Sequence, residues 1–333
     1  MAGWNDVSFD ERERLLRLYE ARDKDALRRE ALLLEISPRT LARRCREHRL
    51  YKQKYAASEV SFPELDTQTF DDFDVIEGDD AVITSDFEEP YADPLVKELI
   101  LLVGIKYNIK RLIINGDFLA SDQPGISSHE PLQIEDKTAT YMQSVRFGGR
   151  NIDAFLKWFD EVIHDRGNHD DMVNRATRGQ IDLGFLLEGH VKEKGYRYTP
   201  YAYVQLETSE GPYLVAHPRQ YRNVGLGLAQ AIYNVWATAD GRKAHIVLGH
   251  THHTNSGASP DNLRGCYTLG CVRHPKKAAY KNLNITTHYE WNQGFGLLMN
   301  GYFHNFDVRR TDWMHWLGDL CPEPFWKRTK FPV

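Results

Sequence analysis

Apolar residues at helical spacing dominate the first part of the chain. They recur every three or four positions, as Leu15, Leu16, Leu18 and Tyr19, then Leu27, Ala31 and Leu34, then Leu41 and Cys45. Ser37 followed by Pro38 is typical of a helix start, with serine as the N-cap and proline in the first turn. The pattern therefore predicts two helices, a tight turn over residues 35–37, and a third helix over Pro38–His48.

The third predicted helix is strongly basic. Glu47 is its only acidic residue, and its four arginines are Arg39, Arg43, Arg44 and Arg46. A basic helix after a tight turn is the outline of a helix-turn-helix, in which the second helix enters the major groove of DNA. A small helical bundle with a solvated basic face gives the same pattern. Residues 1–57 are therefore predicted to form a helical, helix-turn-helix-like domain, a candidate DNA-binding domain through those arginines.

An acidic segment follows this helical region. Residues 58–80 contain Asp and Glu at nine positions and no Lys or Arg. Such a run is usually a solvated linker, so it predicts a boundary before a second domain over residues 81–333. The net charge of -5 excludes a globally basic coat for nucleic acid, so any contact with nucleic acid must come from a local patch.

The second predicted domain alternates short apolar runs with helical patterns. The predicted strands are Ala81–Ser85, Arg111–Asn115, Glu161–Asp165, Tyr213–Ala216 and His245–Leu248, and the predicted helices are Asp93–Tyr107 and Ile152–Phe159. This alternation predicts an α/β sheet with parallel strands. Residues 266–308, rich in Tyr, Phe, Thr and Gly, favour antiparallel strands that cover a second sheet.

Polar residues follow each of the five predicted strands. In order, they are Asp86-Phe87-Glu88, Gly116-Asp117, Gly167-Asn168-His169-Asp170, His217, and Gly249-His250-Thr251-His252. Ligands of open α/β sheets bind outside the carboxyl ends of the strands, so these side chains are expected at one rim. Oxygen and imidazole donors suit Mn²⁺, Fe or Zn²⁺ better than a metal that prefers thiolates. The alternative is a set of unrelated polar residues at strand ends, which the ordered series makes less favourable.

The same series resembles the calcineurin-like metallophosphoesterase family, whose pattern is D-x-H, G-D, G-N-H-D/E, H and G-H-x-H. The resemblance covers residues 81 to about 255. The segment from His217 to Tyr221 is similar to the branch found in bacteriophages and their bacterial hosts. The resemblance implies a four-layer α/β/β/α sandwich of two mixed sheets, preceded here by the small all-α domain.

The resemblance also implies a metal-binding role for each matched residue. Asp86 and His252 would bind a first divalent ion, and Asp117 would bridge it to a second. The second ion would be held by Asn168, His217 and His250. A hydroxide activated by the two ions would attack phosphorus in line.

The family pattern gives His169 a different role, because this residue is expected to stay unligated. It would stabilise the transition state or protonate the leaving oxygen. Its orientation requires a partner, for which Asp122 or Asp170 is the candidate.

Position 88 departs from the family pattern, which has a histidine where this chain has Glu88. A carboxylate can ligate Mn²⁺ or Fe at that place, or Glu88 can hold a metal-bound water. Glu89 fits the spacing less well. We therefore expect two divalent ions, with Mn favoured over Fe, Zn or Mg, and a one-metal centre as the alternative.

Several basic residues adjoin the motifs. Arg166 and Arg219 are candidates to hold phosphate oxygens, and structural salt bridges are the alternative. Arg273, Lys276 and Lys277 form a basic loop that either contacts a nucleic-acid backbone or is solvated.

These features predict a hydrolase, a metallophosphoesterase of phosphodiesterase or nuclease type that acts on a phosphoester substrate, with nucleic acid or nucleotides preferred because a basic domain precedes it. The alternatives are a DNA-binding regulator or scaffold with a degenerate phosphoesterase domain, and a phosphoprotein phosphatase.

No apolar run approaches a membrane span, and the N-terminus lacks a signal pattern. Together with four cysteines that show no C-x-x-C spacing, this predicts a cytoplasmic protein of a bacterium or phage-infected cell, without a membrane partner.

Overall fold

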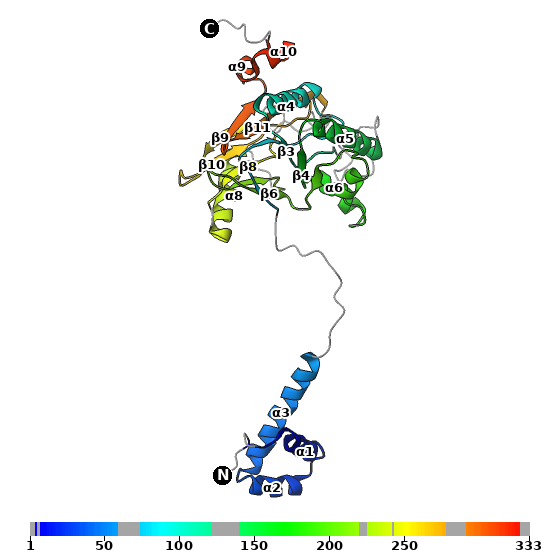
Figure 1. Ribbon diagram of the computed structural model, residues 1–333, viewed down its shortest axis with the longest axis vertical. Helices are drawn as coiled ribbons and strands as arrows, with labels where there is room; N and C mark the ends of the chain where they lie inside the picture. The colour runs from blue at the N-terminus through cyan, green and yellow to red at the C-terminus, as the bar shows by residue number, and fades with distance from the viewer. Residues whose placement is uncertain are drawn as a thin grey trace. The chain divides into compact units, whose positions relative to one another are not determined.

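The computed structural model describes residues 4, 7–58, 74–120, 140–219, 225–241, 243–277 and 291–326. The chain divides into two compact units, Met1–Thr69 and Phe70–Val333 (Figure 1). None of the helices in the described ranges combines the length and the apolar character needed to cross a membrane.

The described residues of the first unit contain three α-helices. They are α1 (Phe9–Glu20), α2 (Lys24–Leu33) and α3 (Pro38–Ser58). They pack around the buried residues Leu15, Leu16, Ala31, Leu41 and Cys45. The backbone N–H of Thr40 donates to Ser37 Oγ at 3.1 Å, so the N-cap predicted at Ser37 is confirmed. The helix α3 continues beyond its predicted end at His48, because no Gly or Pro interrupts residues 49–58.

The second unit contains two six-stranded mixed sheets. The first sheet has the order β1-β6-β7-β8-β10-β9, with bounds Val75–Glu77, Tyr203–Glu207, Tyr213–Ala216, His245–Leu248, Gly265–Thr268 and Asn255–Ala258. The second has the order β12-β11-β2-β3-β4-β5, with bounds Tyr302–Asp307, Gly294–Met299, Ala81–Thr84, Arg111–Asn115, Glu161–Asp165 and Tyr196–Tyr198. The strands β2, β3, β4 and β5 are parallel, and β11 joins β2 in antiparallel fashion.

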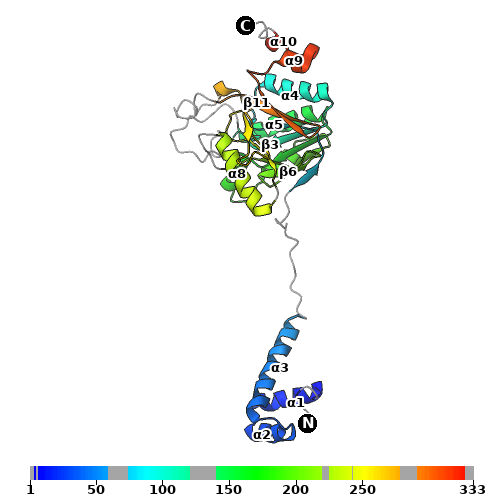
Figure 2. The same cartoon turned by 90° about the vertical axis from the view of Figure 1, so that its left-hand side faces the viewer.

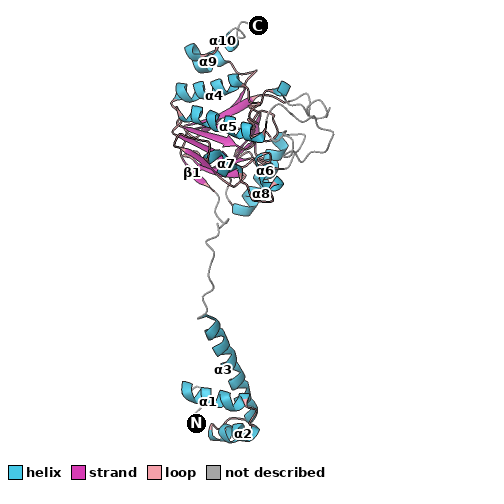
Figure 3. Ribbon diagram, turned by 90° about the vertical axis from the view of Figure 1, so that its right-hand side faces the viewer, coloured by secondary structure: helices cyan, strands magenta, loops and turns pink. Residues whose placement is uncertain are grey.

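Helices cover the outer face of each sheet. The second sheet packs against α4 (Pro94–Tyr107), α5 (Tyr141–Leu156), α7 (Leu183–Glu188) and α9 (Trp313–Leu317), and the first sheet packs against α8 (Gly225–Asp240). The remaining short helices are α6 (Asp170–Ala176) and α10 (Glu323–Trp326). Figures 2 and 3 show the strands between these helices. The predicted four-layer α/β/β/α sandwich is therefore confirmed.

A continuous apolar core lies between the two sheets. Ile83, Ile113 and Ile163 of the second sheet pack with residues of the first, namely Val204, Val215 and Val247. The same three isoleucines are paired across β2, β3 and β4. Strands buried on both faces are expected to be apolar throughout, and this register brings their carboxyl ends to a common edge.

Two further predicted boundaries differ from the structure. The strand β1 lies within residues 58–80, predicted as linker, because Ile76 is buried and its strand pairs with β6. The helix α5 begins at Tyr141 instead of Ile152, with a capping box at Thr140. Within this helix, a Cβ added to Gly148 would lie 2.9 Å from Phe118 and Leu119, so the glycine permits close packing.

The C-terminal strands also differ from expectation, because they divide between the two sheets. The strand β10 pairs with β8 in parallel and with β9 in antiparallel fashion, which extends the first sheet. The hairpin of β11 and β12 extends the second sheet. The described strands of this segment therefore widen both sheets.

Candidate metal centre

The predicted ligands come from both sheets. Asp86 and Glu88 follow β2, Asp117 follows β3, and the Asn168-His169 pair follows β4, all in the second sheet. His217 follows β7, and His250 and His252 follow β8, in the first sheet. The candidate centre therefore straddles the carboxyl ends of strands from two sheets.

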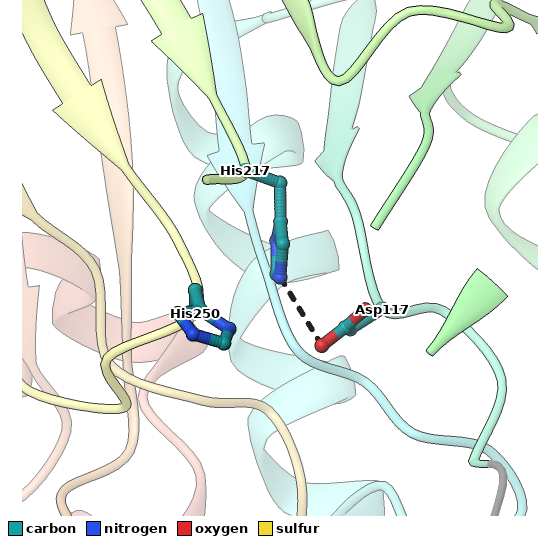
Figure 4. A group of neighbouring side chains, drawn as sticks. All are labelled: Asp117, His217 and His250. Atoms are coloured by element: carbon teal, nitrogen blue, oxygen red, sulfur yellow. Dashed lines mark ion pairs between the residues drawn. The ribbon is translucent and has the colours of Figure 1, made fainter. Parts of the chain in front are cut away.

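Carboxylate and imidazole groups gather at this edge in two clusters. One contains Asp117, His217 and His250 (Figure 4) and the other contains Asp86, Glu88 and His252. In each cluster, one potential ligand atom of every residue lies within 4.8 Å of the others. We call them the Asp117 cluster and the Asp86 cluster.

Short distances connect the two clusters. His217 Nε2 lies 3.1 Å from Asp117 Oδ2, the pair joined by a dashed line in Figure 4, and 4.0 Å from Asp86 Oδ1. In the other cluster, His252 Nε2 lies 2.9 Å from Asp86 Oδ1 and 3.4 Å from Glu88 Oε1. Asp86 and His217 thus place the two clusters side by side.

Hydrogen bonds orient the ligand atoms. His217 Nδ1 lies 2.8 Å from the backbone oxygen of Asn115 and donates its proton there, which directs Nε2 towards Asp117. Backbone N–H groups fix the carboxylates, because His250 N donates to Asp86 Oδ2 at 3.0 Å and His169 N donates to Asp117 Oδ1 at 2.7 Å. A carbonyl that holds the far nitrogen of a histidine is the usual outer partner of a metal-binding imidazole.

The backbone around the ligands is unusual. Five predicted ligands have positive φ angles, namely Asp86 (55°), Glu88 (46°), Asp117 (52°), His250 (72°) and His252 (55°). Residues other than glycine rarely adopt this region, and such conformations are concentrated at functional sites. The backbone therefore supports a functional role for this edge independently of the side chains.

Two glycines allow the close approach of the strand ends. A Cβ on Gly167 would lie 2.1 Å from the backbone nitrogen of Asp117, and a Cβ on Gly116, whose φ is +66°, would lie 2.5 Å from the ring of His217. Any larger residue would displace a predicted ligand.

Electrostatic coupling sets the protonation of the centre. Burial opposes ionisation of Asp86 and Asp117, but the imidazoles around them outweigh it and lower the pKa of both carboxyls. Burial likewise disfavours the charged form of His217, but Asp117 and Asp86 raise its pKa to about 10. Burial, reinforced by His217, lowers the pKa of His250 to about 4.

The donor set fits divalent cations. Each cluster combines carboxylate oxygen with imidazole nitrogen, which suits Mn²⁺, Fe or Zn²⁺. The side-chain oxygen of Asn168 is buried and has no hydrogen-bond partner within the described residues, so it is available as a further donor.

His169 lies at the border of the Asp117 cluster. Its Nε2 is 3.9 Å from Asp117 Oδ2, and its side chain is 15% exposed. Its candidate partner Asp122 lies outside the described residues. Asp170, the other candidate, directs its carboxylate to the backbone N–H groups of Phe118 and Gly167, at 3.1 and 2.9 Å. Asp170 therefore ties together the loops that follow β3 and β4.

Arg166 and Arg219 converge on one carboxylate beside the centre. Arg219 lies 2.5 Å and Arg166 3.6 Å from Asp171, and Arg166 also lies 2.5 Å from Asp182. Both arginines therefore form the salt bridges that were the alternative to phosphate binding. The Arg219 side chain is still 59% exposed, so it remains accessible to an anion.

The two consecutive glutamates have different surroundings. Glu88 belongs to the Asp86 cluster, whereas Glu89 accepts hydrogen bonds from Lys97 and Asn151, each at 2.9 Å. Sequence reasoning missed the partner of Glu88, which is the fully buried Arg273. No spacing signal identifies this arginine, since it lies in a loop that the sequence predicts as exposed.

The arginines of α3 lie in the first unit. Arg39, Arg43 and Arg46 are exposed and share a face of the helix, because they are four and then three residues apart. Arg44 is half-buried, and its guanidinium lies 3.1 Å from Glu47.

No protein-family model and no curated protein matches this chain. Among solved structures, the chain is similar to YfcE, a phosphoesterase from E. coli, with 15% identity and a TM-score of 0.38 over 70% of this chain and 95% of that one. It is also similar to Vps29 complexed with Zn²⁺ from Entamoeba histolytica, with 15% identity and a TM-score of 0.34 over 69% and 98%. It is similar as well to the Pseudomonas putida nuclease MPE, with 14% identity and a TM-score of 0.28 over 68% of this chain and 87% of that one. The functional conclusion therefore depends on the residues at the strand ends.

Proposed function

We propose that this chain is a metal-dependent phosphoesterase of the calcineurin-like metallophosphoesterase family, with nucleic acid or nucleotides as its substrate. One observation carries the proposal, namely the two adjoining carboxylate–imidazole clusters at the strand ends of two sheets. Glu88 contributes to one of these clusters, which argues against a regulator or scaffold with a degenerate centre.

The chain would hold two divalent cations, with Mn²⁺ preferred for a donor set rich in carboxylates. The Asp86 cluster would bind the first ion. The second would be bound by Asn168, His217 and His250, with Asp117 shared between the two. When bound, such cations stabilise charge on the phosphoryl group and lower the pKa of a water molecule that attacks phosphorus.

The remaining residues would position the substrate and move a proton. His169 is partly exposed beside Asp117, so its ring can reach the oxygen of a leaving group and protonate it. Asp170 would hold the loops that carry Asp117 and His169 in place, through its hydrogen bonds to Phe118 and Gly167. Arg219, on the exposed side of its salt bridge, would attract the negative charge of the substrate.

The preference for nucleic acid is supported by α3. Its exposed arginines Arg39, Arg43 and Arg46 form a basic helical face on a chain whose net charge is negative. Neutralising phosphates with arginine supplies most of the sequence-independent affinity for DNA. A phosphoprotein phosphatase, the alternative from the same fold, has no need of such a face.

The proposal predicts hydrolysis that depends on Mn²⁺ and on two residues with different roles. We expect Asp117→Asn to lower kcat by at least about 10³-fold, because several kcal/mol of charge stabilisation are lost with the shared ligand. We expect His169→Asn to lower kcat by about 10²–10⁴-fold with the metal content unchanged. The substrates to compare are bis-p-nitrophenyl phosphate, p-nitrophenyl phosphate, cyclic nucleotides, and single- and double-stranded DNA.

Lys194→Gln is the matched control, because Lys194 is exposed and lies outside both clusters. It should retain full activity. Unchanged hydrolysis in Asp117→Asn would refute the site, and activity on monoesters alone would refute the nucleic-acid substrate.

A further inference from the structure

A buried arginine lies beside the Asp86 cluster. The side chain of Arg273 is fully buried, and its guanidinium forms an ion pair with Glu88, which is fully buried as well. Charged side chains are almost never buried to this extent unless they are paired, because removing them from water is costly. The ion pair therefore requires an explanation in terms of the site that it adjoins.

Arg273 is held in place by the loop that carries the ligands. Its backbone N–H donates to the oxygen of Asp86 at 3.0 Å. Its Nη2 donates to the oxygen of Lys277 at 2.9 Å, and its guanidinium carbon lies 4.8 Å from the centre of the Tyr91 ring. A guanidinium fixed in this way forms a rigid partner for a carboxylate, since less freedom remains to be lost.

The two oxygens of Glu88 face different partners. Oε2 is directed to Arg273, and Oε1 lies 3.4 Å from His252 Nε2 within the Asp86 cluster. A carboxylate arranged in this way can bind a cation through one oxygen while a guanidinium holds the other. Outer partners of metal ligands act in the same manner, since they fix orientation and tune affinity.

The pair also accounts for the charge of the site. The resembled family has a neutral imidazole at position 88, whereas Glu88 adds a negative charge next to Asp86. A carboxylate buried at this depth without a counter-charge would be costly. Arg273 cancels the added charge, so Glu88 and Arg273 together carry the same net charge as one imidazole.

We propose that Arg273 is a positioning residue that holds Glu88 Oε2 and directs Glu88 Oε1 to the first metal ion, so that the Glu88–Arg273 pair replaces a single histidine ligand. This inference rests on the proposed two-metal function. The inference concerns the Asp86 cluster only. An experiment can therefore contradict the role of Arg273 without contradicting the proposed phosphoesterase function.

The test is a Mn²⁺ titration of the full chain by isothermal calorimetry, with elemental analysis of the retained metal. We expect the wild type to bind two equivalents. Arg273→Met should bind one of them about 10–100-fold more weakly and leave the other unchanged. Arg111→Met is the matched control, because Arg111 forms a 2.9 Å ion pair with Glu161 at the opposite end of β3 and should keep both equivalents.

The double variant Glu88→His/Arg273→Met tests the replacement directly. We expect it to regain the second equivalent, whereas Glu88→His alone should not, because it leaves a buried cation next to the ion. Unchanged or tighter binding in Arg273→Met, or one equivalent in the double variant, would overturn the inference. If Arg273→Met does not fold, the double variant decides alone. A wild type that binds no Mn²⁺ would refute the proposed function instead.

Discussion

Five predicted ligands have left-handed backbone conformations, and each has an energetic cost. A residue other than glycine in this region is destabilised by about 1–3 kcal/mol. Hydrogen bonds compensate for this cost at two of them, because the backbone N–H of His250 donates to Asp86 and that of His169 donates to Asp117. These hydrogen bonds fix the backbone conformation of two candidate ligands.

The protonation of two histidines predicts how the metal-free protein responds to pH. His217 has a pKa of about 10, above the ordinary 6.5, so its stabilisation is complete below pH 6.5 and is lost as the pH rises through 10. His250 has a pKa of about 4 and is buried in its neutral form, so stability is lost as the pH falls from 6.5 through 4. We expect the melting temperature in chelator to be highest near pH 6.5.

His217→Asn provides the control for this profile. Asparagine does not titrate, so the loss of stability above pH 6.5 should flatten. The loss on the acid side should persist, because burial is the main cause of the low pKa of His250. An alkaline side of the same slope in the variant would show that another group causes the loss.

The sequence predicts where the candidate ligands lie, because each of them follows a strand. Each of the five motifs follows an apolar run that the structure shows as a strand. Arg273 could not be predicted, because its contact with Glu88 joins residues far apart in the chain without any spacing pattern. The contact of Asp170 with the loop after β3 was equally hidden, since its partner there is the backbone N–H of Phe118, 52 residues away in the chain.

At the scale of elements, the sequence predicts those strands correctly that are buried on both faces, because such strands must consist of apolar residues. The strands β2, β3 and β4 are buried on both faces, so their apolar runs are unambiguous. The start of α5 was missed because Gly148 serves packing against Phe118 and Leu119, a requirement that only the folded chain shows. The short strand β1 was missed because acidic residues surround its one buried side chain, Ile76.

The helix α3 carries a prediction of its own. Reversing the charge of Arg39, Arg43 and Arg46 to glutamate should weaken DNA binding by more than about tenfold and reduce its dependence on salt, because contacts to phosphates are lost. Fluorescence anisotropy with labelled duplex DNA measures the affinity and its dependence on salt. The salt concentration should be varied from about 50 to about 200 mM, a range over which phosphate contacts change the affinity strongly.

Hydrolysis of bis-p-nitrophenyl phosphate serves as the control for this variant, since a small substrate needs no DNA-binding face. Its rate should not change. Equal DNA affinity in the variant and the wild type would exclude α3 as the binding element. The cluster Leu15, Leu41 and Cys45 that holds the three helices together is not altered.

At the scale of the whole molecule, the candidate ligands come from both sheets, so ions bound as proposed would join the two sheets. An ion that binds only the folded state adds about 2.7 kcal/mol at a concentration 100 times its Kd. Each kcal/mol corresponds to about 2–4 °C for a domain of about 150–250 residues. We therefore expect EDTA to lower the melting temperature by about 5–10 °C per ion.

Differential scanning calorimetry measures this shift, and Asp117→Asn should show a smaller one because it removes a shared ligand. A melting temperature that EDTA leaves unchanged would mean that the sheets hold together without ions. The apolar core of Ile83, Ile113 and Val247 would then carry the contact between the sheets by itself.

The order of the ligands along the chain has a consequence for biosynthesis. Asp86 and His252 are separated by 166 residues, which a ribosome adds in roughly 8–33 s at about 5–20 residues per second. If these residues bind an ion as proposed, the Asp86 cluster is incomplete during that interval, and binding at that cluster would wait for His252. Ribosome-bound chains stalled on either side of His252 should differ sharply in manganese uptake, and equal uptake would show that loading starts earlier.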